Sequence, residues 1–196
     1  MAPTHRLRAS GTTHRRALLR ALGGLVLSGP LGLQAAGAAP PEVAGEVPEA
    51  RLVGQGRLRY FGLHIYDAEL WAGPSLAAGD TDYARQPLAL VLRYARSLDG
   101  AKIAERSIEE MRRIGAFSAE QSATWLRFMN EAFPDVQDGD RLTGLYRPGE
   151  AAAFAFNGKP RATLRDAEFA RLFFGIWLAP TTSQPGLRAR LLGLKA

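Results

Sequence analysis

Residues 54 to 73, with the sequence GQGRLRYFGLHIYDAELWAG, constrain the fold of this chain more than any other segment. They are rich in aromatic and aliphatic residues and contain no proline, a composition typical of β-strands. We therefore predict a strand pair here, with strands beginning near Arg51. The pair carries the candidate site residues Arg57, Arg59, His64 and Tyr66.

Another strand is predicted over residues 87 to 96. There Leu88, Leu90, Leu92 and Tyr94 alternate with other residues and so share one face. Tyr94 adds a second tyrosine to the candidate site.

Helical patterns follow these strands. Residues 101 to 114 carry apolar side chains at helical spacing, and Gly115 ends the pattern. Ser118 and Gln121 form a capping box, because each side chain can satisfy a backbone N–H that the first turn leaves unpaired. A last helix over residues 167 to 178 is apolar on nearly all sides, so we expect it to lie in the centre of the fold.

Further strands are predicted between these helices, over residues 140 to 147, 151 to 156 and 160 to 164. Asn157 and Gly158 predict a tight hairpin turn, since both tolerate positive φ angles. The order of strands, two helices, strands and helix differs from the regular alternation of a parallel sheet. It predicts an α+β fold in which helices cover one side of an antiparallel sheet.

The first 38 residues have the pattern of a secretory signal. They contain five arginines and no acidic residue, followed by a short apolar run and the small residues Ala36-Gly37-Ala38. Residues 13 to 19, THRRALL, resemble a twin-arginine signal. The apolar run is too short, and too interrupted by glycine and proline, to span a bilayer. We expect cleavage near Ala38, a periplasmic or secreted protein, and no stable membrane span after cleavage.

The charge of the chain argues against nucleic acid as a partner. The full sequence has 25 basic and 19 acidic residues, and removing the five leader arginines leaves 20 against 19. The predicted mature protein is therefore nearly neutral. Residues 39 to 49, rich in proline, are predicted to form a linker to a domain over residues 50 to 194.

Side-chain chemistry limits the kinds of site. The chain has no cysteine, so disulfides, thiolate metal sites and thiol nucleophiles are excluded. His64 is the one histidine after the leader, and a metal site based on histidines would lack a second imidazole. We predict no metal and no cofactor. His64 is interpreted either as a half-buried strand residue or as a proton carrier.

Several motifs in order resemble the chalcone isomerase-like family over residues 50 to 194. The motifs are Leu52-Val53-Gly54-Gln55-Gly56-Arg57, Tyr66-Asp67-Ala68-Glu69-Leu70-Trp71, Leu92-Arg93-Tyr94, Asn157-Gly158, Asp166-Ala167-Glu168-Phe169, Ile176-Trp177-Leu178, Leu187-Arg188 and Leu191-Leu192-Gly193. The resemblance implies an open-faced antiparallel β-sandwich, a large sheet backed by helices. This agrees with the order of elements predicted above.

The resemblance implies one of two activities. Plant enzymes of the family close a chalcone into a flavanone, with an arginine stabilising the developing negative charge. A second branch resembles fatty-acid binders, in which an arginine and a tyrosine hold the carboxylate. The family arginine corresponds to Arg57 or Arg59, and the threonine to Tyr66. The family tyrosine falls near Asp99, which is also explained as a helix cap.

Two more family positions are not matched. The asparagine falls near Arg106, and the C-terminal hydroxyl residue falls near Ile176. We therefore expect no flavanone formation.

The main hypothesis is an exported protein that binds a small amphipathic acid, such as a fatty acid or an aromatic acid, in a cleft between sheet and helices. Arg57 or Arg59 would pair with the carboxylate, and Tyr66 or Tyr94 would add a hydrogen bond. The arginines could instead form exposed ion pairs with Asp67 or Glu69, and the tyrosines could be core residues.

Geometry sets one condition on this hypothesis. Arg59 and Tyr66 are separated by an odd number of residues and would point to opposite faces of a regular strand, unless a bulge, for example at Gly62, intervenes. Two other functions stay open: an isomerase or intramolecular lyase acting on an enone, and a non-catalytic module that binds a partner protein.

Overall fold

The computed structural model describes residues 37–194, which belong to one compact unit, Ala35–Ala196. The predicted secretory signal therefore lies almost wholly outside the described residues. Within residues 37–194 no helix is both long enough and apolar enough to cross a bilayer.

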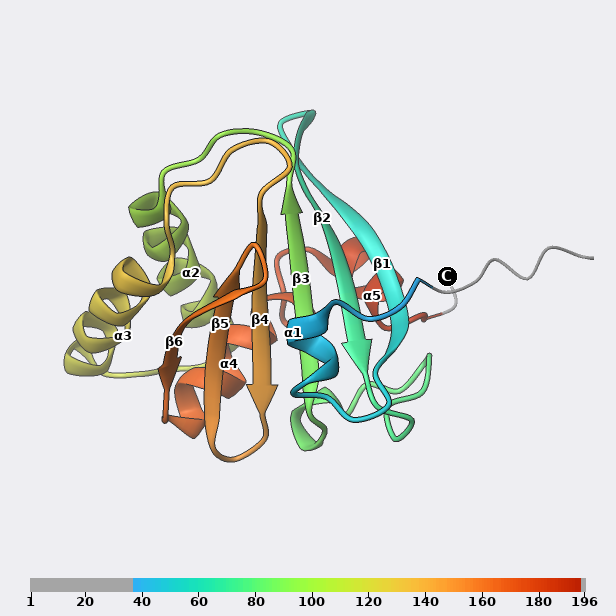
Figure 1. The fold of residues 1–196 in the computed structure, drawn as a ribbon. Coiled ribbons are helices and arrows are strands. Elements are labelled where there is room, and N and C mark those ends of the chain that lie inside the picture. Colours follow the sequence, from blue (N-terminus) through green and yellow to red (C-terminus); the bar gives the residue numbers. More distant parts are fainter. Residues whose placement is uncertain (1–36, 195–196) are drawn as a thin grey trace, which may run out of the picture. The chain divides into compact units, whose positions relative to one another are not determined.

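A single antiparallel sheet forms the frame of the unit (Figure 1). Its strands follow one another in the sheet in the same order as in the chain. They are β1 (Arg51–Tyr60), β2 (Leu63–Ala72), β3 (Leu88–Tyr94), β4 (Arg141–Arg147), β5 (Ala151–Phe156) and β6 (Lys159–Leu164). Because every neighbouring pair is antiparallel, hairpins or longer excursions on one side can connect them.

Helices cover the two faces of this sheet unequally. The larger helices are α2 (Gly100–Ile114), α3 (Ala119–Ala132), α4 (Ala167–Leu178) and α5 (Pro185–Leu191). They lie on one face, here called the inner face, and the short helix α1 (Pro41–Ala44) lies on the other, the outer face (Figure 1). A short 3-10 turn, Tyr83–Arg85, precedes β3. The predicted α+β architecture, an antiparallel sheet backed by helices, is confirmed.

Local signals in the sequence account for the helix boundaries. Ser118 and Gln121 form the predicted capping box at the start of α3. Asp166 caps α4 by accepting hydrogen bonds from the backbone N–H groups of Glu168 and Phe169. Asp99 caps α2 in the same way, through the N–H groups of residues 101 and 102, so the interpretation of Asp99 as a helix cap is confirmed.

Helix α4 lies in the centre of the main core, as its composition predicts. Phe169, Leu172, Phe174 and Leu178 are fully buried, and the α4 rings pack against aromatic side chains of α3 and of the sheet. Burying this many apolar side chains is the main source of stability in a domain of this size.

The segment predicted to be a linker, residues 39 to 49, is instead part of the domain. Val43 and Val47 lie four residues apart, one on α1 and one just after it, and both are buried against Trp71 and Val91 on the outer face of the sheet. The linker prediction was wrong because the proline-rich composition concealed two apolar residues at a spacing that one helical turn brings together.

The β1–β2 hairpin also differs from the prediction. Gly62 does not form a bulge; Phe61 and Gly62 are the two turn residues, both with positive φ. The irregularity lies one step into the strands, where Leu58 pairs with Tyr66 but the next residue, Arg59, pairs with His64. This register decides which side chains of the hairpin face the helices.

Helix α5 packs closely on β1, and this contact explains the two glycines at the start of the strand. A Cβ atom at Gly54 would collide with the backbone carbonyl oxygen of Arg190, and one at Gly56 would lie 2.7 Å from the Leu187 side chain. The Gly-Gln-Gly sequence is therefore required by packing.

Candidate ligand-binding site

A cavity of about 310 Å³ lies between the inner face of the sheet and helices α2 and α4. This volume is at the lower end of the range of roughly 300–1,000 Å³ for small-molecule sites. The interior is mainly apolar, and the lining residues that matter below are Leu58, Tyr60, Tyr66, Tyr94, Lys102, Ile103, Arg106, Glu110, Phe173, Ile176, Trp177, Ser183 and Gln184.

Two tyrosine side chains provide polar groups deep in this cavity. Tyr66 on β2 and Tyr94 on β3 are direct partners across the strands, so both point to the inner face. Their rings meet edge to face at 5.9 Å between centroids. The indole N–H of Trp177 donates to the Tyr66 hydroxyl at 2.9 Å, which leaves the Tyr66 O–H free to donate to a ligand.

Burial keeps both tyrosines neutral. Desolvation raises the pKa of Tyr66 well above its usual range; the hydrogen bond from Trp177 opposes this shift and the negative charge of Glu110 adds to it. Burial likewise raises the pKa of Tyr94, with a smaller contribution from Tyr66. At neutral pH the two groups are therefore hydrogen-bond donors and not bases.

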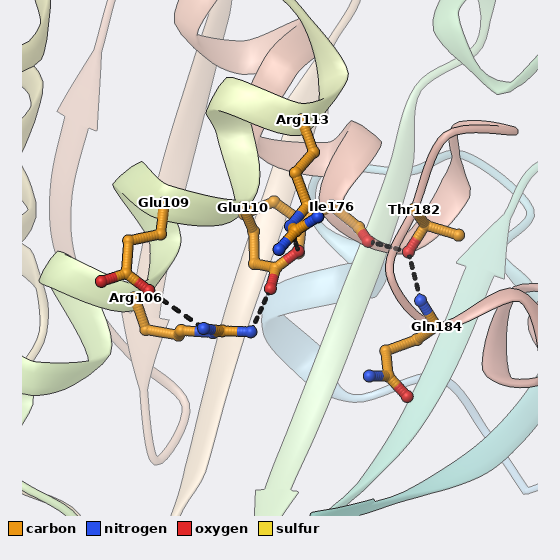
Figure 2. Close-up of polar contacts among 7 residues, drawn as sticks. All are labelled: Arg106, Glu109, Glu110, Arg113, Ile176, Thr182 and Gln184. Carbon is orange, nitrogen blue, oxygen red and sulfur yellow. Dashed lines mark hydrogen bonds and ion pairs between the residues drawn. The ribbon is translucent and has the colours of Figure 1, made fainter.

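Helix α2 supplies the charged wall of the cavity (Figure 2). Arg106 donates to Glu109 at 3.0 Å and also to Glu110, and the Nε atom of Arg113 lies 3.5 Å from the other Glu110 oxygen. The Glu110 side chain is 7% exposed and that of Arg106 is 52% exposed. A buried carboxylate is thus held between two arginines, one of which lies at the cavity mouth.

The segment after α4 closes the opposite wall. The Thr182 hydroxyl donates to the backbone oxygen of Ile176 at 2.5 Å and accepts from the backbone N–H of Gln184 at 3.1 Å. As Figure 2 shows, these contacts hold the chain in a turn beside α4. They fix Ser183 and Gln184 at the rim, where each presents a polar side chain.

Exposure distinguishes the mouth of the cavity from its floor. Tyr60, Lys102, Arg106 and Ser183 are exposed lining residues and mark the mouth. Tyr66, Tyr94, Phe173 and Trp177 are buried or half-buried and form the floor. A ligand with a polar end and an apolar body would find both kinds of surface here.

The two arginines expected to hold a carboxylate lie on the outer face instead. The Nε atom of Arg57 donates to Asp67 at 2.8 Å, and the two side chains are 48% and 44% exposed. Arg59 donates to the backbone oxygen of Gly62 at 3.3 Å. Between the two arginines, Leu58 points into the cavity, so the structure does not bring Arg57 or Arg59 together with Tyr66 and Tyr94.

His64 also lies outside the cavity lining. Its Nε2 atom is 3.2 Å from Asp67 Oδ1 but lacks hydrogen-bond geometry, and its side chain is about one quarter exposed. This placement matches the interpretation of His64 as a half-buried strand residue. Among the described residues no cluster of three or more His, Cys, Asp or Glu side chains is suited to a metal ion.

Sequence reasoning missed the charged residues that do line the cavity. Of the adjacent carboxylates Glu109 and Glu110, only Glu109 is exposed. A signal was present: Glu110 follows Ile103 by seven residues, which is two helical turns, so both lie on the stripe that faces the sheet. Trp177 was expected only as part of the core, and its N–H proves to orient Tyr66.

Comparison with known proteins supports this description. A family model described as chalcone isomerase-like matches residues 40–193. An uncharacterized protein of Haemophilus influenzae is 27% identical over 141 residues, covering 72% of this chain and 67% of that protein.

A solved structure, a fatty-acid binding protein of Arabidopsis thaliana, superposes with a TM-score of 0.58 at 14% identity. The match covers 74% of this chain and 88% of that one. At this identity the likeness shows a shared fold.

Proposed function

From the premise that this chain belongs to the chalcone isomerase-like family, we propose that it binds a small amphipathic acid, such as a medium-chain fatty acid. The observation that carries the proposal is the mainly apolar cavity with the Tyr66 and Tyr94 hydroxyls on its floor and Arg106 at its mouth. Buried hydroxyls are costly without partners, so a ligand that accepts their hydrogen bonds would stabilise them.

Arg106 takes the role first assigned to Arg57 or Arg59. It is an arginine of the cavity lining, and its guanidinium already binds two carboxylates of α2. An incoming carboxylate would compete with Glu109 and Glu110 for the same donors. Lys102, also at the mouth and paired with Glu105 at 2.7 Å, is a second cation within the same wall.

The experiment is a calorimetric titration of the unit Ala35–Ala196 with dodecanoate. We expect Arg106→Gln to weaken binding by about tenfold or more, the scale of a charged hydrogen bond. The matched control is Arg57→Gln, which removes an arginine of the outer face and should leave the affinity unchanged. Equal affinities in all three proteins would contradict the site, and no binding by the parent protein would contradict the function.

We further propose that flavanone formation is absent. Asp99, near the family tyrosine position, is occupied as the cap of α2 and accepts backbone hydrogen bonds at 2.8 and 3.2 Å. Cyclisation of a chalcone added to the purified protein, followed by its absorbance, tests this; turnover above the uncatalysed rate would contradict it.

Export is also a proposal, supported by the sequence of residues 1–38 alone. N-terminal sequencing of the protein recovered from a periplasmic fraction should find a start near position 39. An intact leader on the mature protein would contradict cleavage.

A further inference from the structure

We propose that the tip of the β1–β2 hairpin, defined as Tyr60, Phe61 and Leu63, docks the protein on a lipid surface with the cavity mouth facing the lipid. Docking does not depend on which ligand the cavity holds. Only the passage of that ligand between the lipid and the cavity rests on the proposed function.

The first observation is the position of the exposed apolar side chains. Tyr60, Phe61 and Leu63 are 51%, 86% and 52% exposed, and they are the large hydrophobic residues that stand out to solvent in the described part of the chain. All three lie at one turn, which projects from one end of the sheet (Figure 1). Scattered single exposures are ordinary, whereas a concentration of this kind at a projecting tip indicates a contact surface.

The second observation is the backbone conformation of Phe61. Phe61 and Gly62 have φ angles of 46° and 78°, so the phenylalanine occupies the left-handed region that bulky residues avoid. The β5–β6 turn has nearly the same geometry, with φ angles of 49° and 81°, and carries Asn157 and Gly158. The β5–β6 turn therefore has a residue that this geometry favours, whereas the β1–β2 turn has an exposed aromatic residue in a strained conformation. Backbone outliers of this kind are often found at functional sites.

The third observation is continuity with the cavity. Tyr60 is at once an exposed residue of the tip and part of the cavity wall, and its ring packs edge to face on Phe61 at 4.5 Å. Insertion of Phe61 and Leu63 into a lipid interface would therefore bring the cavity mouth to that interface. An acyl chain could then move along the Tyr60 ring without crossing water.

The chemistry of the tip favours a lipid surface over a protein partner. Three side chains on a convex turn offer far less than the roughly 800 Å² per partner of a stable protein interface. A lipid interface needs no complementary shape, and it accommodates aromatic rings at the level of the headgroups. Arg59 lies at the base of the turn, where its guanidinium could contact headgroup phosphates.

The test is flotation of the unit Ala35–Ala196 with two kinds of vesicle. One is phosphatidylcholine alone and the other is phosphatidylcholine mixed with phosphatidylglycerol. The core clusters of the described residues lie within this unit, and omitting the basic leader removes a competing membrane contact. We expect the parent protein to float with both, and more strongly with the anionic mixture because of Arg59.

The informative variant is Phe61→Asn, which gives the β1–β2 turn the Asn-Gly sequence of the β5–β6 turn. It should lower the vesicle-bound fraction by about tenfold or more, the effect of withdrawing one phenylalanine from an apolar phase. The melting temperature should stay the same or rise by about 2 °C, because asparagine accepts positive φ more readily. Loss of binding would then not be a consequence of unfolding.

Phe61→Trp is the matched control. It should still float, and the part of its tryptophan emission that exceeds that of the parent protein, which has Trp71, Trp125 and Trp177, should shift to the blue when vesicles are added. Phe61→Asn should bind dodecanoate in solution like the parent protein. This measurement distinguishes a loss of vesicle binding from a loss of ligand binding in the cavity. Equal flotation of the parent and Phe61→Asn, no flotation of the parent, or an unshifted tryptophan would each overturn the proposal.

Discussion

Polar side chains on the two faces of strands β2 and β3 differ in exposure and in their partners. On the outer face, Asp67 forms an ion pair with Arg57 that remains nearly half exposed. On the inner face, at the neighbouring position, Tyr66 is half-buried against Tyr94 and receives a hydrogen bond from Trp177. An exposed ion pair contributes little to stability, whereas a buried hydroxyl requires a partner.

This difference shows where to look for a site. The Arg57 and Asp67 charges on the outer face are explained by solvent and by each other. The hydroxyls on the inner face lie in an apolar cavity with one free donor at Tyr66 and, among the residues described, no protein partner for Tyr94. Polar groups that the fold itself does not satisfy are better evidence of a ligand than are prominent arginines.

The largest expected effect is a loss of stability at alkaline pH, caused by the two tyrosines of the inner face. Burial raises the pKa of Tyr66 and Tyr94 above the unfolded value of about 10, so their contribution to stability is complete below pH 10. Above pH 10 the unfolded chain releases protons that the folded chain retains, and each tyrosine lowers the free energy of unfolding by about 1.4 kcal/mol per pH unit.

The double variant Tyr66→Phe/Tyr94→Phe checks this expectation. In urea denaturation from about pH 8 to pH 11, the slope above about pH 10 should be shallower than in the parent protein by roughly 3 kcal/mol per pH unit. Tyr83 and Tyr146 also have raised pKa values through burial, so some slope should remain. Parallel curves for the two proteins would show that the two inner tyrosines do not stay neutral.

Single substitutions should separate the two inner tyrosines. Tyr66→Phe leaves the Trp177 N–H without its acceptor and should lower the free energy of unfolding by about 1–3 kcal/mol. Tyr94→Phe removes a hydroxyl without a protein partner and should leave stability nearly unchanged, while weakening dodecanoate binding. Thermal denaturation of both variants at pH 7 measures the contrast, and equal losses would contradict the assigned partners.

The substitution Glu110→Gln should increase the affinity of the inner-face cavity for an acid. The glutamine keeps the size of the side chain but removes a buried negative charge that competes for Arg106. We expect dodecanoate to bind about tenfold more tightly, a gain of roughly 1.4 kcal/mol. The control is Glu109→Gln, at an exposed position beside it, where a smaller gain is expected. Weaker binding in Glu110→Gln would show that the carboxylate supports the ligand.

Local sequence signals predicted most of the fold. The capping box at Ser118, the Asn157-Gly158 turn and the apolar α4 pattern depend on neighbours in the chain, so the sequence alone contains them. Docking of Val43 and Val47 on the outer face depends instead on a sheet formed by distant residues. Their four-residue spacing places them on one side of a helical turn, but it does not indicate which surface they contact.

The site was predicted less completely because its faces depend on strand register. Tyr66 and Tyr94 were identified as candidates, and both line the cavity. Arg57 and Leu58 are adjacent, and which of them faces the helices is decided by the Phe61–Gly62 turn and the shift after Leu58. A change of one residue in register exchanges the two faces, so composition could identify the strand pair but not the arginine.

The outer face should give the smallest effect, and Arg57→Ala tests it. The hydrogen bond from Arg57 holds the pKa of Asp67 below its usual range, with burial opposing and His64 adding to the shift. A lowered carboxyl pKa stabilises the fold at neutral pH, and that contribution is lost as the pH falls below about 4.

Because both side chains are nearly half exposed, solvent screens the pair, and the melting temperature of Arg57→Ala at pH 7 should stay within replicate error. Dodecanoate affinity should change by less than about twofold. A marked loss of affinity in Arg57→Ala, with Arg106→Gln unaffected, would move the carboxylate site to the outer face.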